Sequence, residues 1–368
     1  MAGLAVALTY QNCDVTYVAE QPMSEVRASQ GWLAPRLSSV QLALASSEIE
    51  VGRLVASAPR DSIHVCQGIR GNRLIGRAQA GLMKRGLRQW VVMEAVDDSG
   101  WRGFFKRLEY RRLFWRWRDR LQGVLATGHD TADWVVRRGM PLDRVFPFAY
   151  FLPESASDLP PRPTKRTRFR FVFVGRLVEQ KRVDLLIAAM ARLQESEVEL
   201  AVIGSGPLEI ELRMATKAAL PPDRVVWVGR LPLGDVPAEI AKADCLVLPS
   251  RYDGWGAVVS EAIMVGTPVV CSDRCGSAGV VRASGNGGVF RSGDLDALVC
   301  ELRRAMSQGR LSVEERLRLA EWGQCLGARA GASYLRRVLD HADGCLERPA
   351  PPWGKTRQGR RPSELMSV

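Results

Sequence analysis

Residues 245–271 read CLVLPSRYDGWGAVVSEAIMVGTPVVC, and this stretch decides the fold. It begins and ends with short, continuously apolar runs, Cys245–Leu248 and Val269–Cys271, which are typical of strands buried on both faces. Between them, the glycine-rich turn 253–256 precedes a segment with helical periodicity. The order of strand, turn, helix and strand predicts one unit of a parallel sheet that is covered by helices.

The same alternation continues on both sides of this stretch. Further strands are expected at Phe169–Val174, Val198–Ile203 and Val225–Val228, and in the first half at Val15–Ala19, Ile63–Cys66, Trp90–Val92, Val124–Thr127 and Val145–Ala149. The segment between the two series is rich in proline and charge, as linkers are. We therefore predict two α/β domains: residues 1–151, a linker 152–168, residues 169–344, and a disordered basic tail 345–368.

The first domain is expected to lack its first strand. Ala5–Thr9 looks like the end of a helix that leads into the first predicted strand. A Rossmann-like domain has a strand and a glycine-rich turn before that helix, and that strand is central in the sheet. We expect a gap in the sheet, and a natural start roughly 20 residues upstream.

Composition limits the class of protein. The 368 residues carry 52 Lys and Arg against 40 Asp and Glu, and no apolar run approaches the ~18 residues that span a bilayer. The eight cysteines show no CxxC spacing, and only three histidines occur, so neither a disulfide framework nor a metal centre is expected. The N-terminus lacks the basic start of a secretory signal. We expect a cytoplasmic protein with reduced thiols.

Much of the positive charge lies in one segment. The window 102–120 holds eight basic and two acidic residues, interleaved with aromatic ones. Such a segment suits a helix at an anionic membrane surface, with these residues at the interface: Phe104, Phe105, Arg111, Arg112, Trp115 and Trp117. The alternative is a helix of a soluble protein with one buried face. No nucleic-acid partner is expected, because no recognition helix, zinc finger or RNP-like signature accompanies the charge.

Polar groups gather where the strands of the second half end. Arg176 and Lys181 follow the strand 169–174, where two cations would suit a diphosphate; a solvated loop is the alternative. Gly204 and Gly206 follow the next strand and would let a ligand approach the backbone, or simply form an ordinary turn.

Two carboxylates flank the start of the helix in residues 245–271. The amides near residues 257–259 can bind phosphate oxygens at the helix N-terminus. Asp253 precedes that helix and Glu261 lies one to two turns inside it, where they could bind sugar hydroxyls on either side of a phosphate. Alternatively, Asp253 caps the helix and Glu261 is a surface residue.

At this point the chain resembles the retaining glycosyltransferases of the GT-B fold, specifically glycosyltransferase family 4. The resemblance rests on Asp253-Gly254-Trp255-Gly256, Glu261-Ala262 and Gly266-Thr267-Pro268-Val269-Val270, and it extends from Gly175-Arg176 to Gly293-Asp294. It covers residues 169–300 closely and the first half in outline. It implies two Rossmann-like domains, a nucleotide-diphospho-sugar donor, no cofactor and no required metal.

The resemblance also implies roles for single residues. Arg176 and Lys181 would hold the donor diphosphate, Glu261 the ribose hydroxyls, and Asp253 the hydroxyls of the donor sugar. Asp253 stands where the family has Glu, so it is one methylene shorter. The remaining donor-binding residues would be Gly175, Gly204, Gly206, Gly229, Arg230, Gly254, Trp255, Gly256, Val258 and Val259.

The first half contributes candidates on the acceptor side. His64, Gln67 and Gly68 belong to a segment that resembles the family's Asp-x-x-His-x-His-Gly run, with Cys66 in place of the second His. Glu94, after a later strand, could contact an acceptor hydroxyl or act as a base, or it could be a plain loop residue.

Two functional interpretations follow. The first is a hexosyltransferase on the inner face of the cell membrane, which transfers sugar to a glycan or lipid-linked acceptor in surface polysaccharide, lipopolysaccharide or glycolipid synthesis. The second is a non-catalytic membrane- or polyanion-binding remnant of such an enzyme.

Overall fold

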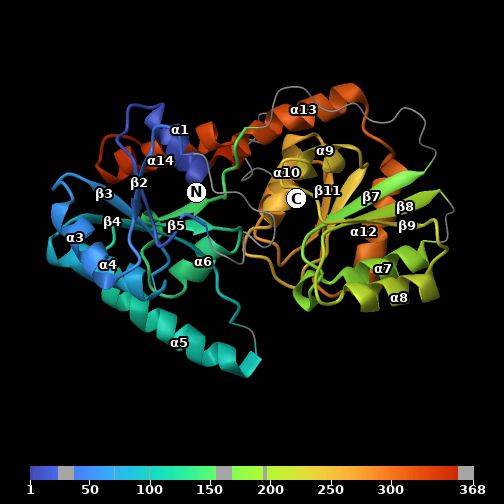
Figure 1. Ribbon diagram of the computed structural model, residues 1–368, viewed down its shortest axis with the longest axis horizontal. Coiled ribbons are helices and arrows are strands. Elements are labelled where there is room, and N and C mark those ends of the chain that lie inside the picture. The colour runs from blue at the N-terminus through green and yellow to red at the C-terminus, as the bar shows by residue number, and fades with distance from the viewer. Residues whose placement is uncertain (24–36, 70, 99, 155–167, 194–196, 355–368) are drawn as a thin grey trace. The chain divides into compact units, whose positions relative to one another are not determined.

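The computed structural model describes residues 1–23, 37–69, 71–98, 100–154, 168–193 and 197–354 (Figure 1). It divides into two compact units. Among the described residues, the first contains those of Met1–Phe151 and Ala328–Pro352, and the second contains those of Leu152–Gly327 together with Trp353 and Gly354. In the described ranges, no helix is both long enough and apolar enough to cross a bilayer.

The second unit is built on one parallel sheet. Its six strands lie in the order β12 (Gly287–Phe290), β11 (Val269–Ser272), β10 (Cys245–Leu248), β7 (Phe169–Val174), β8 (Val198–Ile203) and β9 (Val225–Gly229). β10 is buried along its whole length, and Phe171 and Phe173 of β7 are fully buried. The expected parallel sheet with apolar strands is confirmed.

Helices cover both faces of this sheet, as Figure 1 shows. One face carries α7 (Val183–Arg192), α8 (Glu209–Ala219) and α12 (Leu295–Gln308), and the other carries α9 (Val236–Ala241), α10 (Ala257–Met264) and α13 (Val313–Gly323). The remaining elements are α11 (Ala278–Ser284), between β11 and β12, and the short 3-10 helices η2 (Glu179–Lys181), η3 (Gln324–Leu326) and η4 (Pro352–Gly354).

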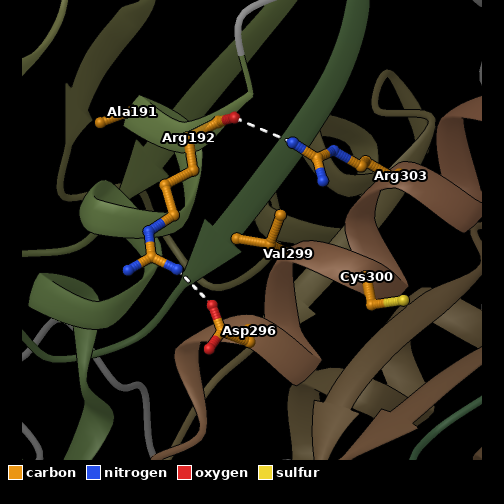
Figure 2. A pocket seen from close by; sticks show the side chains of 6 residues that line it. All are labelled: Ala191, Arg192, Asp296, Val299, Cys300 and Arg303. Carbon is orange, nitrogen blue, oxygen red and sulfur yellow. Dashed lines mark hydrogen bonds and ion pairs between the residues drawn. The ribbon is translucent and has the colours of Figure 1, made fainter.

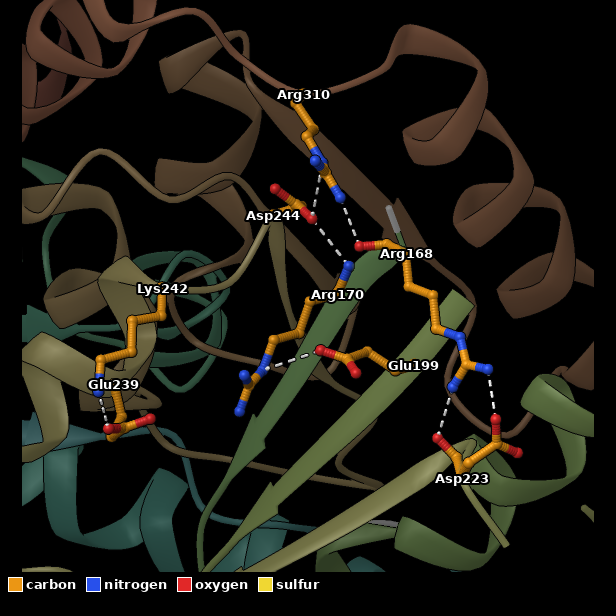
Figure 3. Close-up of polar contacts among 8 residues, drawn as sticks. All are labelled: Arg168, Arg170, Glu199, Asp223, Glu239, Lys242, Asp244 and Arg310. Carbon is orange, nitrogen blue, oxygen red and sulfur yellow. Dashed lines mark hydrogen bonds and ion pairs between the residues drawn. The ribbon is translucent and has the colours of Figure 1, made fainter. Parts of the chain in front are cut away.

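Charged side chains are paired at the amino end of the sheet (Figure 3). The backbone N–H of Arg170 donates to Oδ2 of Asp244 at 2.8 Å, and its Nε lies 3.7 Å from Oε1 of Glu199. Nε of Arg310 lies 3.4 Å from the same Asp244 oxygen. Because Arg170 and Asp244 are both buried, these contacts compensate charges that water cannot reach.

The strands of the first unit form two separate parallel sheets. β1 (Thr16–Ala19) pairs with β2 (Gln41–Leu44), and a four-stranded sheet has the order β3 (Ile63–Gln67), β4 (Arg88–Glu94), β5 (Gly123–Thr127) and β6 (Val145–Phe148). Between the two sheets the described residues contain no ladder. The helices are α1 (Ala2–Thr9), α3 (Glu48–Ser57), α4 (Arg73–Lys84), α5 (Gly100–Trp117), α6 (Thr131–Val136), η1 (Leu142–Arg144) and α14 (Ala328–Ala342).

The predicted boundary at 344 is wrong, because the chain returns to the first unit at Ala328. In Figure 1, α14 lies beside α1. The buried ring of Tyr334 stacks on Phe148 with 6.2 Å between centroids. A Cβ on Gly331 would lie 2.3 Å from the ring of Phe151, so only glycine lets the helix approach this closely.

Part of the expected tail is also ordered against the first unit. Nη1 of Arg348 donates to the carbonyl of Asp143 at 2.9 Å, and its guanidinium lies 4.4 Å above the Phe146 ring. Residues 355–368 lie outside the described residues, as do residues 155–167 of the predicted linker.

Candidate active site in the second unit

The candidate site lies where the strand order of the second unit changes direction. From β7 the chain continues to β8 on one side of the sheet, whereas β10 and β11 lie on the other side. The loops after β7 and β10 therefore leave the sheet in opposite directions, and ligands of open α/β sheets bind at such a switch point. Arg176 and Lys181 belong to the first of these loops and Asp253 to the second.

Three contacts fasten the two loops to each other. The backbone N–H of Arg251 donates to the carbonyl of Gln180 at 2.8 Å, and Nε2 of Gln180 donates to the carbonyl of Tyr252 at 2.8 Å. Nζ of Lys181 forms an ion pair with Oδ2 of Asp253 at 2.5 Å. Sequence reasoning missed Gln180, because nothing in its local pattern indicates that its amide reaches the other loop.

The Lys181–Asp253 pair bears on two expectations: that Asp253 could cap α10, and that Lys181 is a cation available to a diphosphate. Asp253 does not cap α10: the N-cap residue is Gly256, and no side chain caps this helix. Both charged groups are largely buried and they neutralise each other. Lys181 is therefore not a free cation while this pair is intact.

Arg176 has no such partner. It follows Gly175 directly after β7 and is exposed. Across the ranges that the structure describes, its guanidinium has no hydrogen bond or ion pair. An unpaired guanidinium with five donors is suited to bind an anion such as a phosphate.

The N-terminus of α10 adds backbone donors to the same edge. Gly256 has φ 78° and packs tightly, since a Cβ there would lie 2.9 Å from Cδ2 of Leu248. The hydrogen-bonded turn begins at Val259, whose N–H donates to the carbonyl of Gly256 at 2.9 Å. The amides of Ala257 and Val258 therefore remain as donors at the positive end of the helix. Val259, which we expected among the donor-binding residues, supplies none.

Glu261 lies in the second turn of α10 and is not a plain surface residue. Burial raises the pKa of its carboxyl to about 7, because a charge there loses contact with water. The group thus changes its charge near neutral pH. In its ionised form it can accept hydrogen bonds from two hydroxyls at once.

Trp255 is structural rather than exposed to a ligand. Its side chain is only 2% exposed, and its indole Nε1–H donates to Oγ of Ser260 at 3.0 Å. Its neighbour Gly254 packs closely on the next loop, since a Cβ on Gly276 would lie 1.8 Å from the Gly254 oxygen. These contacts hold the turn that leads into α10.

The glycines after β7, β8 and β9 pack backbone against backbone. A Cβ on Gly204, which has φ 132°, would lie 1.9 Å from the carbonyl oxygen of Gly175, and one on Gly206 would lie 2.4 Å from that of Leu177. The N–H of Gly204 also donates to the carbonyl of Gly229 at 2.8 Å. The structure therefore brings these predicted glycines together.

Arg230 joins the same turns, because its Nε donates to Oγ of Ser205. This contact places a second guanidinium beside the glycine turn after β8. Its side chain is exposed, as is that of Arg176.

The acceptor-side candidates of the first unit are only partly brought together. Gln67 and Gly68 end β3, and Glu94 ends the neighbouring β4, so all three lie at the carboxyl edge of that sheet. His64 instead lies near the start of β3, where Nε2 is 2.9 Å from Oγ of Ser62. Burial and the nearby charge of Arg85 lower its pKa. His64 therefore lies away from the carboxyl edge that Gln67, Gly68 and Glu94 share.

Two other features of the described residues bear on ligand binding. They contain no group of three His, Cys, Asp or Glu side chains that could hold a metal ion. A cavity between α7 and α12 is lined by Ala191, Arg192, Asp296, Val299, Cys300 and Arg303 (Figure 2). Its charged groups already bond to one another or to backbone, and none of the candidate residues lines it.

Comparison with known families matches the second half of the chain. Residues 157–324, which contain all the donor-side candidates, match the family described as glycosyl transferases group 1. A 2-deoxystreptamine N-acetyl-D-glucosaminyltransferase of Streptomyces fradiae is 30% identical over 227 residues, which cover 57% of this chain and 52% of that protein. A GDP-mannose-dependent phosphatidylinositol monomannoside mannosyltransferase of Mycolicibacterium smegmatis is 32% identical over 176 residues, covering 40% of this chain and 46% of the relative. The chain thus spans about half the length of these two relatives.

Solved structures match nearly the whole chain. The Anabaena protein HepE in complex with UDP superposes with a TM-score of 0.70 at 13% identity, covering 92% of this chain and 95% of that one. A lipopolysaccharide outer core galactosyltransferase, WaaB, gives a TM-score of 0.66 at 19% identity, covering 83% of this chain and 85% of that one. The protein therefore has the GT-B glycosyltransferase fold with two Rossmann-like domains, and its residues 157–324 resemble the group 1 glycosyl transferases.

Proposed function

We propose that the protein is a glycosyltransferase that moves a sugar from a nucleotide-diphospho-sugar to a glycan or lipid-linked acceptor. The observation that carries this proposal is the unpaired guanidinium of Arg176 at the switch point of the second unit. It lies in the loop that is fastened to the turn before α10, so a guanidinium, free helix amides and two carboxylates belong to one edge of the sheet. The similarity to sugar transferases and to a UDP-bound fold supports a nucleotide-sugar as the ligand.

Each group has a distinct task in this proposal. Arg176 and the amides of Ala257 and Val258 bind the diphosphate, and Lys181 adds its charge when its pair with Asp253 opens to the ligand. Asp253 then accepts hydrogen bonds from the sugar, and ionised Glu261 accepts them from the ribose. These cations oppose the charge on the leaving diphosphate, which makes a metal ion dispensable.

The transfer itself is proposed to retain the anomeric configuration. The bond from the anomeric carbon to the diphosphate oxygen breaks, and the acceptor oxygen forms a bond to the same face of that carbon. The acceptor proton passes to the departing diphosphate oxygen, so charge and atoms balance. Gln67, Gly68 and Glu94 are the candidates for acceptor contacts in the first unit.

The experiment is a donor-turnover assay with UDP-, GDP- and ADP-sugars in the presence of EDTA. Release of nucleoside diphosphate is measured, and the anomer of the released or transferred sugar is read by NMR. We expect turnover with one donor class. Arg176→Ala should lose turnover and bind the nucleotide about 10- to 100-fold more weakly, whereas Asp253→Asn should lose turnover but still bind the diphosphate.

Arg192→Ala serves as the control, because Arg192 lies at the cavity of Figure 2 and outside the candidate site. Unchanged turnover in Arg176→Ala would contradict the assignment of the diphosphate site. Absence of turnover with every donor, in a folded protein, would favour the non-catalytic remnant instead.

A further inference from the structure

Helix α5 is apolar on two opposite faces. On its inner side, Phe114 is fully buried, and Tyr110, Leu113 and Trp117 pack against the same core cluster of the first unit. On its outer side, large apolar residues recur at the three- and four-residue spacing that defines one face of a helix. These outer residues are Trp101, Phe104, Phe105, Leu108 and Trp115.

The outer residues are strongly exposed. Their relative exposure ranges from 40% at Leu108 to 73% at Trp101. From position 101 to position 115 the stripe extends about 21 Å along the helix. Figure 1 shows α5 along the border of the first unit, with one side turned away from the sheets. Apolar groups gathered in this way mark an interaction surface rather than scattered surface residues.

Cations accompany the stripe on the same side of the helix. Arg111, Arg112 and Arg116 are exposed, and Arg112 lies within the stripe, between Leu108 and Trp115. Lys106 and Arg107 lie toward the protein, where they donate to the carbonyls of Asp97 and Asp98 at 2.7 Å each. The outer face therefore combines aromatic rings with positive charge, and the nearby basic residues anchor the helix.

We propose that the outer face of α5 docks on an anionic lipid surface, with the aromatic side chains inserted at the headgroup level. Aromatic rings prefer this depth, and each nearby cation adds attraction to acidic headgroups. Trp117, expected at the interface from sequence, is excluded from the lipid-facing set because it packs on the core. The inference is independent of the donor site, which lies in the other unit.

Charge distinguishes lipid from the other possible occupants. A second copy docked through the same face would bring Arg111 and Arg112 of both copies into one apolar interface, where like charges repel. A nucleic acid would use the arginines but would not require a stripe of Phe, Leu and Trp along the helix. An anionic bilayer satisfies both the apolar and the cationic groups.

The test is co-sedimentation of the full chain with vesicles of phosphatidylcholine, with and without phosphatidylglycerol. We expect binding to the anionic vesicles, weakened by salt, and little binding to the neutral ones. The double variant Arg111→Gln/Arg112→Gln should bind about 30-fold more weakly. Phe104→Ser/Trp115→Ser should lose at least about tenfold.

Matched controls remove the same chemistry elsewhere. Ile210→Ser/Met214→Ser removes two exposed apolar residues of α8, and Arg53→Gln/Arg60→Gln removes two exposed cations of the first unit. Both should bind like the parent protein. Because all the replaced residues are exposed, thermal unfolding should change little, and each pair tests the proposal separately.

Four outcomes would overturn the inference. The first is failure of the parent protein to bind anionic vesicles, and the second is binding by both α5 variants that equals binding by the parent. The third is a loss of binding in the control variants as large as that in the α5 variants. The fourth is a parent protein that forms dimers without binding vesicles, with the dimers dissociating in Phe104→Ser/Trp115→Ser. Retention on DNA without vesicle binding would likewise replace lipid by nucleic acid.

Discussion

The Glu261→Gln substitution should stabilise the second unit at alkaline pH and change its stability little at pH 5. Burial raises the pKa of this carboxyl from 4.5 to about 7 in the folded protein. The folded state therefore binds a proton more tightly than the unfolded state does. Below pH 4.5 both states are protonated and the wild type suffers no penalty. As the pH rises from 4.5 to about 7 the penalty grows, and above that it is constant.

The size of the penalty follows from the two pKa values. Each pKa unit corresponds to 1.36 kcal/mol, so the full effect is about 3 kcal/mol, or 2 to 3 kcal/mol allowing for partial contact with water. Glutamine is close in shape and carries no charge at any pH. The variant should therefore gain about 2 kcal/mol over the wild type between pH 5 and pH 8.5.

Urea unfolding at several pH values measures this difference directly. Glu211→Gln, at an exposed position on α8, is the control and should follow the wild-type profile. Parallel profiles for the wild type and Glu261→Gln would refute the reasoning, as would a gain confined to acidic pH. Nucleotide affinity provides a second measurement. In the wild type it should increase as the pH rises through 7, because only the ionised carboxylate accepts hydrogen bonds from both ribose hydroxyls. In Glu261→Gln the affinity should not depend on pH in this range.

Three further substitutions probe the framework of the site. Asp244→Ala should cost about 1 to 3 kcal/mol of unfolding free energy, because it leaves the buried backbone N–H of Arg170 without its acceptor and removes the carboxylate that pairs with Arg310; chemical denaturation measures the loss, and a cost under about 0.5 kcal/mol would contradict these contacts. Gly204→Ala should cost at least about 1 to 3 kcal/mol, since its Cβ would lie 1.9 Å from a carbonyl oxygen and φ is 132°; a wild-type melting temperature would show that the turn relaxes freely. Trp255→Phe should cost about 1 to 2 kcal/mol by leaving the Ser260 hydroxyl unpaired, yet it should alter nucleotide affinity little; a large loss of affinity with unchanged stability would mean that the ring contacts the ligand.

Much of the second unit can be predicted from sequence because its strands are buried on both faces. Continuous apolar runs gave the bounds of β7, β8 and β10 as the structure has them. The edge strand β12 was missed, since two of its four residues are glycines and it has no apolar run. β2 was missed for a different reason, because this strand has only four residues and most of it is exposed.

The return of the chain to the first unit could not be predicted. The periodicity of α14 indicates that one face is buried, but it does not indicate which unit covers that face. The decisive contacts are long-range: Gly331 on Phe151 and Tyr334 on Phe148. No local pattern encodes such pairs.

The position of the candidate site can be predicted from sequence more readily than the contacts within it. Parallel strands bring their carboxyl ends to one edge, so loops after β7 and β10 had to be neighbours. The pairing of Lys181 with Asp253 depends on Gln180 and the backbone of Arg251, which bind the loops together. The sequence therefore predicts that Arg176, Lys181 and Asp253 lie at one edge of the sheet. It does not predict that Lys181 and Asp253 neutralise each other.

Calorimetric titration of the full chain with UDP, GDP and ADP, in EDTA, tests the central claim most directly. We predict that one of the three binds, that Arg176→Ala weakens this binding by about 10- to 100-fold through the loss of charge-assisted hydrogen bonds, and that Arg192→Ala binds like the wild type. Equal affinity in Arg176→Ala, or no binding of any nucleotide to the folded protein, would contradict a diphosphate site at the switch point.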